Sequence, residues 1–271
     1  MKKILFLTLF VLAFHSLNSF AQFNTSVKSK TKNHDKTSLK KRLKLYPDSS
    51  NMALCFSIDA GYQIPTGNMY NRFGDSKSIG FTTFYKTKSN FFIGATADYF
   101  FGKNVKEKDL FKNISTPDNN IITAEGSYAE IRLYERGYFI GPTFGYKSKL
   151  LSKNRNSGLS FWLSTGFFEH KIKILGDNLY QLSPSYKVGY DRLTNGFALK
   201  PAIYYFNISR THLVNYRIGI EFLAGFTQGQ RNINFDTGLS GRERRFDGMI
   251  NLKACWFLPK FLYGGNREIT Y

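Results

Sequence analysis

The sequence is poor in several residue types, and each shortage excludes a class of protein. Its 271 residues include two cysteines and four histidines. These are too few for a disulfide scaffold, a cysteine-rich zinc module or a multi-histidine metal centre. We therefore predict no metal and no cofactor. The 19 acidic residues are outnumbered by 38 basic ones, and aromatic residues make up 17% of the chain. That aromatic content excludes a disordered chain, and the length suits one large domain.

Long apolar runs are also scarce, and the one that stands out lies at the start. Lys2 and Lys3 precede an apolar run, which ends at the small-x-small triplet Ser19-Phe20-Ala21. This order is typical of a secretory signal, so we predict that residues 1–21 are removed after Ala21 and that the chain is exported. Beyond it, no stretch approaches the ~20 apolar residues that a membrane helix needs.

The next segment, residues 22–50, is polar and basic and lacks apolar periodicity. We predict a flexible periplasmic arm. Two interpretations remain open for it: an arm that binds an acidic partner, or a solvated linker. Export to the periplasm disfavours nucleic acid as that partner.

From residue 51 the sequence alternates with a period of two, which is typical of β-strands. In 52–64 the even positions are mostly large and apolar, whereas the odd positions are small or polar. The same alternation recurs in 77–86, 91–102, 138–146, 159–167, 197–206, 214–226 and 246–258. Strands of about ten residues can cross a bilayer when tilted. The fold class is therefore predicted as all-β, an eight-stranded antiparallel up-and-down transmembrane β-barrel over 51–258, followed by a C-terminal tail over 259–271.

The connectors between these strands alternate between long and short. The longest are 103–137 and 170–196, and the shortest is 87–90. Such alternation is expected of a barrel with short periplasmic turns and long extracellular loops. Pro142 and Pro201 interrupt two of the strands, and we interpret them as marks of β-bulges.

Which face points inward separates a membrane barrel from a soluble lipocalin-like barrel, whose apolar face lines the interior. Here the polar face is rich in small residues, which suit the interior of a narrow barrel. The apolar face carries aromatic residues near strand ends, where membrane interfaces favour them. They are Tyr62, Tyr85, Tyr99, Tyr138, Tyr146, Tyr205, Tyr216 and Trp256. We therefore predict that the apolar face points outward into an outer membrane.

This architecture resembles that of the small outer-membrane barrels of the OmpA/OmpX type. In addition, Arg72-Phe73-Gly74, Glu135-Arg136-Gly137 and the segment 189–196 are similar to segments of uncharacterised barrels from Bacteroidota-type, Gram-negative bacteria. The resemblance implies an integral outer-membrane protein of the cell envelope and brings no activity with it.

Charged residues recur on the face predicted to line the interior. They are Asp59, Lys86, Asp98, Lys147, Lys200, Arg217, Glu221 and Lys253. Because unpaired buried charge is costly, we expect them to pair. The arrangement is either a gated ion path or a polar plug. The plug is favoured because side chains fill the interior of an eight-stranded barrel.

Cys55 and Cys255 lie on the same face of the first and last strands, which become neighbours when a barrel closes. Pairing Met52 with Leu258 would also place the two cysteines opposite each other. In an oxidising compartment they could form a disulfide or a close contact, or remain unpaired, and both alternatives stay open.

The remaining candidates concern the loops and catalysis. Arg231, Arg242, Arg244 and Arg245 could bind phosphates of lipopolysaccharide, or simply belong to a solvated loop. The predicted partners are therefore outer-membrane lipid, lipopolysaccharide or an envelope complex. His170 lies near a strand end, where it could serve a lipid-modifying hydrolase or acyltransferase. We predict no enzymatic activity. A structural or accessory envelope role is the first hypothesis, and the lipid-modifying enzyme and a small-solute channel are the alternatives.

Overall fold

The computed structural model describes residues 52–107, 109–118, 120–123, 125–152, 157–176, 183–208 and 215–262. The predicted signal peptide, the basic arm and residues 263–271 of the predicted tail lie outside these ranges. Within them, no helix is long and apolar enough to span a membrane.

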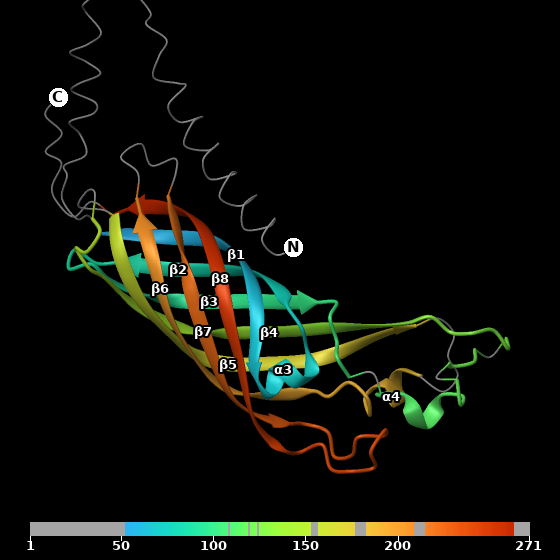
Figure 1. Ribbon diagram of the computed structural model, residues 1–271. Helices are drawn as coiled ribbons and strands as arrows, with labels where there is room; N and C mark the ends of the chain where they lie inside the picture. The colour runs from blue at the N-terminus through green and yellow to red at the C-terminus, as the bar shows by residue number, and fades with distance from the viewer. Residues whose placement is uncertain are drawn as a thin grey trace, which may run out of the picture. The chain divides into compact units, whose positions relative to one another are not determined.

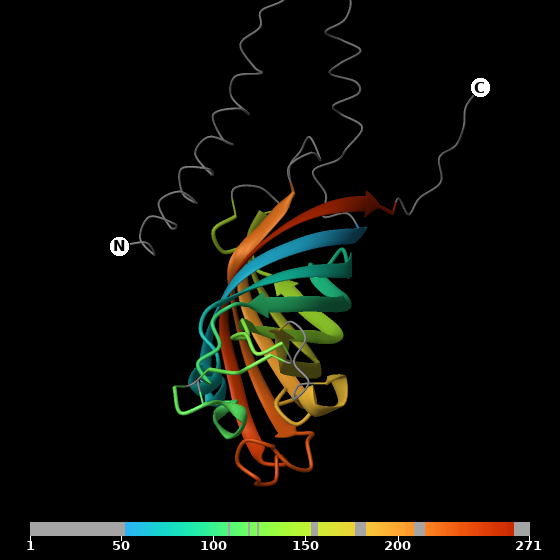
Figure 2. The same cartoon turned by 90° about the vertical axis from the view of Figure 1, so that its right-hand side faces the viewer.

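Eight antiparallel strands form one closed ring in the order of the sequence, which confirms the predicted up-and-down barrel (Figure 1). In Figure 2 the first strand, in blue, lies beside the last, in red. The strands are β1 (Ala53–Gly67), β2 (Ser76–Lys86), β3 (Phe91–Gly102), β4 (Ile131–Lys147), β5 (Ser157–Gly176), β6 (Thr194–Asn207), β7 (Tyr216–Gly229) and β8 (Arg244–Phe261). The connections include the short helices α3 (Asn68–Arg72) and α4 (Pro184–Lys187) and the 3-10 turn η1 (Lys112–Ile114).

The two ends of the barrel differ in their connections. At the end where β1 begins, β2 and β3 are joined by residues 87–90 alone, and we call it the turn end. The opposite end, the loop end, carries the connections from β1 to β2, from β3 to β4, from β5 to β6 and from β7 to β8. The last strand continues to Phe261, past its predicted end at Leu258. The extension exists because Pro259 and Phe261 pair with Cys55 and Ala53 at the closing seam.

The faces of the wall are as predicted. In β1 the even residues Phe56, Ile58 and Ile64 are exposed, whereas Cys55 and Asp59 are completely buried. The same division runs round the ring, so large apolar side chains cover the outside. Aromatic residues of the outer face contact one another across strands near the strand ends, such as Tyr205 with Tyr216 at the turn end and Phe226 with Phe246 at the loop end, at 6.4 and 5.7 Å between ring centroids.

Both predicted bulges are absent. Ile140 pairs with Phe167 and Thr143 with Ser164 on the two sides of Pro142, so no extra residue is inserted. The register is likewise unchanged across Pro201. Each proline instead loses its pairing with one neighbouring strand and keeps the other. Pro142 pairs with Ala95 of β3 but not with β5, and Pro201 pairs with Leu163 of β5 but not with β7. A single missing ladder hydrogen bond is therefore tolerated without a shift of register.

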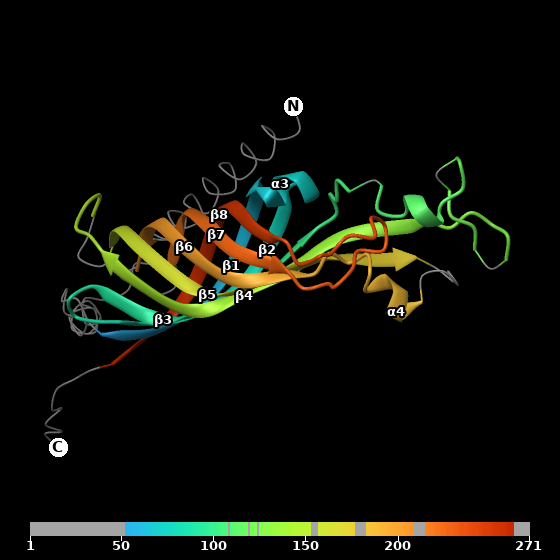
Figure 3. The ribbon, with the colours of Figure 1, turned by 90° about the horizontal axis from the view of Figure 1, so that it is seen from below.

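β4 and β5 are longer than predicted, and their added residues form a two-stranded ribbon that extends beyond the rest of the barrel (Figure 3). The strands β3 and β4 stop pairing at Glu135, but β4 and β5 pair on to Ile131 and Gly176. In this extension the alternation is inverted: Ile172 and Ile174 are buried on the inside, and Lys171 and Lys173 are exposed on the outside. The sequence predicts these residues as loop, because a membrane strand is expected to carry its apolar residues on the outer face.

Candidate functional site: the filled interior of the barrel

The interior of the barrel contains a charged layer at mid-height, which begins at Asp59 of β1. Its carboxylate accepts hydrogen bonds from Ser57 and from Thr82 of β2, the latter at 2.5 Å. The Arg217 guanidinium of β7 lies 3.2 Å away and also donates to the Thr82 hydroxyl at 2.9 Å. The Thr82 hydroxyl in turn lies 3.0 Å from that of Thr96 on β3. Asp59 is completely buried, and these donors compensate for the loss of water around its charge.

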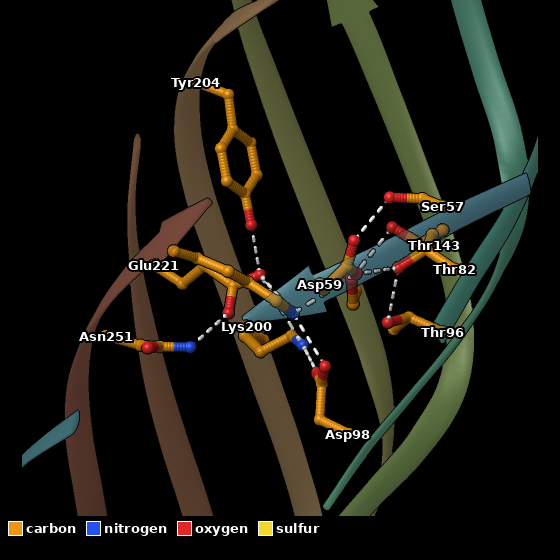
Figure 4. Close-up of polar contacts among 12 residues, drawn as sticks. Ser57, Asp59, Thr82, Thr96, Asp98, Thr143, Lys200, Tyr204, Glu221 and Asn251 are labelled. Carbon is orange, nitrogen blue, oxygen red and sulfur yellow. Dashed lines mark hydrogen bonds and ion pairs between the residues drawn. The ribbon is translucent and has the colours of Figure 1, made fainter. Parts of the chain in front are cut away.

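The second part of the charged layer joins Asp98 of β3 and Glu221 of β7 to two lysines (Figure 4). Asp98 accepts hydrogen bonds from Lys200 of β6 and from Lys253 of β8, the latter at 2.7 Å. Glu221 lies 3.6 Å from the Lys200 amine and 3.4 Å from that of Lys253. The Tyr204 hydroxyl and the amide of Asn251 also donate to Glu221, the amide at 3.0 Å.

Lys253 connects the two parts because its amine also lies 3.6 Å from Asp59. The charged layer therefore joins three acids to three bases from five strands, and their formal charges cancel. Buried ion pairs are tolerated when each partner is compensated in this way. The structure thus brings together Asp59, Asp98, Lys200, Arg217, Glu221 and Lys253, six of the eight predicted interior charges.

Lys86 and Lys147 do not belong to the charged layer. Both are buried on the inner face at the last residues of β2 and β4, at the turn end. Lys86 pairs across the ladder with Ala53, and Lys147 with Ser160. The period of two correctly assigned them to the interior but carried no information about height along the barrel.

An aromatic cluster closes the interior between the charged layer and the turn end. Phe84 lies at its centre, with ring centroids 5.2 Å from Trp162 and 5.7 Å from Phe257. Phe92 and Phe206 pack beside it. The Arg217 guanidinium lies over the Trp162 ring at 4.6 Å, a cation–π contact that joins this aromatic cluster to the charged layer.

A second apolar cluster fills the loop end. It combines inward residues of the strands, such as Phe100 and Phe168, with loop residues such as Phe111 and Tyr190. The described parts of the loops therefore fold onto the interior instead of leaving it open. A cavity of about 10 Å³ remains between this cluster and the charged layer, lined in part by Asp98, Lys200 and Glu221. That volume holds about one water molecule, so the interior has the character of a plug.

His170, the candidate catalytic residue, lies inside this loop-end cluster. Its side chain is completely buried, and its Nε2 lies 2.9 Å from Asp247 of β8. The rings of Phe73 and Phe168 pack against it at 5.6 and 5.4 Å between centroids. A histidine enclosed in this way cannot contact a lipid ester outside the barrel, so the position does not favour the hydrolase alternative.

The two cysteines are not bonded to each other, which favours the unpaired alternative over the disulfide. Cys55 pairs with Pro259, and Cys255 pairs with Asp59. The seam is thus shifted by four residues from the register that would place the cysteines opposite each other. Four residues of strand span about 13 Å, whereas a disulfide requires Cα atoms less than about 7 Å apart.

The four candidate arginines have different surroundings at the loop end. Arg231 makes a two-pronged ion pair with Asp191, at 2.8 and 2.5 Å, and these hydrogen bonds raise the pKa of its guanidinium. Arg245 donates to the backbone oxygen of Asn68 at 3.1 Å. Arg242 and Arg244 are exposed. Two of the four are therefore occupied in joining loops, and two face solvent.

Arg72 and Arg192 were not predicted and make further ion pairs between the loops. Arg72 of α3 and Arg192 both bind Glu107, at 2.7 and 3.0 Å, and Arg192 also pairs with Asp236. Burial lowers the pKa of Arg72. No sequence signal assigns these partners, because the loops have no regular period. Tyr204, Thr82 and Asn251 were also missed, although as polar residues on the inward face they could have been found.

Comparison with known proteins assigns no family. No protein-family model matches the chain, and no curated protein matches it. Among solved structures, Ail, the attachment invasion locus protein of Yersinia pestis, was crystallised with the heparin analogue sucrose octasulfate. That structure is 9% identical with a TM-score of 0.40, and the alignment covers 77% of this chain and 99% of Ail. Neisserial surface protein A, NspA, is 11% identical with a TM-score of 0.37, and the alignment covers 76% of this chain and 96% of NspA. The sulfated ligand is an observation on Ail alone. The similarity to barrels of Bacteroidota-type bacteria stays a prediction.

Proposed function

We propose that the chain is an integral outer-membrane β-barrel with a structural or accessory role in the cell envelope. The observation that carries this proposal is the continuous apolar outer wall of a closed barrel whose interior is ion-paired. On β8 this wall runs from Phe246 to Leu258, with Ile250, Leu252 and Trp256 exposed between them. A tilted strand of this length covers roughly 30 Å, close to the height of the apolar band on membrane barrels.

A soluble barrel would require the opposite arrangement. Lipocalin-like proteins enclose an apolar ligand and expose polar residues, whereas here the apolar residues surround the barrel and the charges lie inside. An exposed apolar surface of this extent is a membrane or protein contact in native proteins. The aromatic pairs near both ends of the strands suit the two interfaces of a bilayer.

The filled interior supports a structural or accessory role. The charged layer lies between two apolar clusters, which disfavours a diffusion channel. The enclosure of His170 disfavours an enzyme that acts on membrane lipids. The loops and the predicted arm over 22–50 are then the parts left to contact partners in an envelope complex. Arg242 and Arg244, exposed at the loop end, are available to phosphates of lipopolysaccharide.

The test of membrane insertion is fractionation followed by a denaturing gel of boiled and unboiled outer membranes. We expect the chain in the outer-membrane fraction, with a faster band when unboiled because a closed barrel resists the detergent. Recovery in the soluble periplasm, with no difference between boiled and unboiled samples, would contradict the proposal.

The filled interior is tested by reconstituting the purified chain in a planar bilayer. We expect no single-channel steps, since side chains occupy the lumen. A porin reconstituted in the same bilayer is the positive control. Reproducible steps from the purified chain would favour the small-solute channel instead.

A further inference from the structure

The outer wall over β2 to β5 carries a cationic patch at the loop end, formed by Lys77, Arg136, Lys171 and Lys173. Arg136 of β4 pairs directly with Lys171 of β5, and Lys173 lies one outward position further along β5. Lys77 of β2 and Arg136 both pair with Phe101 of β3, from its two sides. Arg136, Lys171 and Lys173 thus occupy adjoining outward positions on β4 and β5, and Lys77 lies on β2, separated from Arg136 by Phe101 of β3.

The patch places like charges opposite each other. Directly opposed cross-strand residues have Cβ atoms about 5 Å apart, and two cations there destabilise the pair. Among the described residues, no acidic side chain forms an ion pair with these four cations. Arg132 on the same two-stranded ribbon differs, because it binds Glu130 at 2.7 Å. The nearest acid on the same face is Glu169, two residues before Lys171 and diagonal to Arg136 across the ladder, and it offsets at most one of the four positive charges. The patch therefore retains an excess of positive charge.

The patch lies at the border where the apolar outer wall ends. On β4 the outward residues change from Ile140 and Tyr138 to Arg136, and on β2 they change from Ile79 to Lys77. The cations therefore lie directly above the aromatic border of the wall. If the barrel is inserted as proposed, this is the level of the headgroups of the outer leaflet. A lipid phosphate could contact the cations there while the acyl chains of the same lipid remain in the membrane.

We infer that this patch binds the phosphate of an outer-leaflet glycolipid. Phosphate oxygens would offset the repulsion between Arg136 and Lys171, and the acyl chains would lie against Tyr99, Tyr138 and Phe167 below. This site is distinct from Arg231, Arg242, Arg244 and Arg245, which lie on the β7–β8 side of the barrel. The inference rests on the proposed insertion in the outer membrane.

The test compares lipopolysaccharide with the same material after enzymatic removal of its phosphates. The full chain is folded into phosphatidylcholine vesicles, and each glycolipid is titrated in. The readouts are the temperature at which the fast-migrating gel band disappears and the affinity for fluorescent lipopolysaccharide. The test variant is R136Q/K171Q, which keeps polar side chains at both positions of the outer face. The matched control is K260Q, since Lys260 is an exposed cation on the wall at the turn end.

We expect phosphorylated lipopolysaccharide to raise that temperature in the wild type and in K260Q. In R136Q/K171Q we expect its affinity to fall about 25-fold, as the loss of two cations near an anionic surface implies. An unchanged response of the double variant, equal stabilisation by dephosphorylated material, or equal stabilisation by soluble inorganic phosphate would each overturn the inference. Absence of the fast band in phosphatidylcholine alone would instead refute membrane insertion, and the inference with it.

Discussion

The charged layer and the two apolar clusters share one narrow lumen but fill it by opposite rules. In the charged layer, polar side chains from several strands satisfy one another, and each acid has at least two donors. In the apolar clusters, rings such as Phe84 and Trp162 pack edge to face, and their volume is what matters. The comparison teaches that the charged layer depends on balance, whereas the clusters depend on shape.

The largest effect is expected from breaking the balance of charge. The substitution Asp98→Asn removes the shared partner of Lys200 and Lys253 and leaves one buried cation in excess. We expect the free energy of unfolding to fall by about 3–5 kcal/mol. Urea unfolding of the chain in lipid vesicles, followed by tryptophan fluorescence, measures it.

The matched control for this substitution restores neutrality. In D98N/K253Q, one acid and one base are removed together, so two of each remain. We expect this double variant to be more stable than D98N alone, even though it has lost more hydrogen bonds. If D98N/K253Q is the less stable of the two, then individual contacts matter more than balance.

The next effect in size tests the importance of shape in the turn-end cluster. Phe84→Ala leaves a cavity among Trp162, Phe206 and Phe257, and we expect a loss of about 3 kcal/mol. Phe84→Leu, which keeps most of the volume, should cost much less. Equal losses for the two variants in the same urea assay would show that aromatic contacts, and not volume, stabilise the cluster.

Ion pairs at the loop end should matter less than those in the charged layer, because water reaches them. Side-chain exposure is 24% for Arg231 and 13% for Asp191. For Arg231→Gln we expect a loss of about 1 kcal/mol or less, confined to the loops. We therefore expect faster protease cleavage in the loops and no change in the temperature at which the fast-migrating gel band disappears. A large fall in that temperature would mean that loop docking supports the whole barrel.

The smallest effect is expected from the cysteines. Because Cys55 and Cys255 are offset by four residues at the seam, oxidation has no bridge to form. Thiol labelling of the unfolded chain should modify both cysteines equally with and without prior reduction. Labelling that appears only after reduction would contradict the register of the seam.

Much of the fold could be predicted from the sequence, since a period of two directly encodes which side chains share a face. The inward position of Asp59 and Lys253, and the outward position of Ile58 and Trp256, followed from alternation alone. The prediction failed where that rule changes with the environment. At Lys171 and Ile172 the outer face becomes charged and the inner face packs on loops, so the expected pattern is reversed. For Arg231 no pattern identified Asp191 as a partner.

The sequence by itself determined the number of strands and the two faces of the wall. Only the tertiary structure decided the heights of the strands relative to one another. The reason is physical: alternation with a period of two is unchanged when a strand slides by an even number of residues. A slide of four residues separates Cys55 from Cys255 while leaving both inside the barrel. The ion pairs joining Asp98, Lys200 and Lys253 depend on those heights, and therefore on closure of the barrel as a whole.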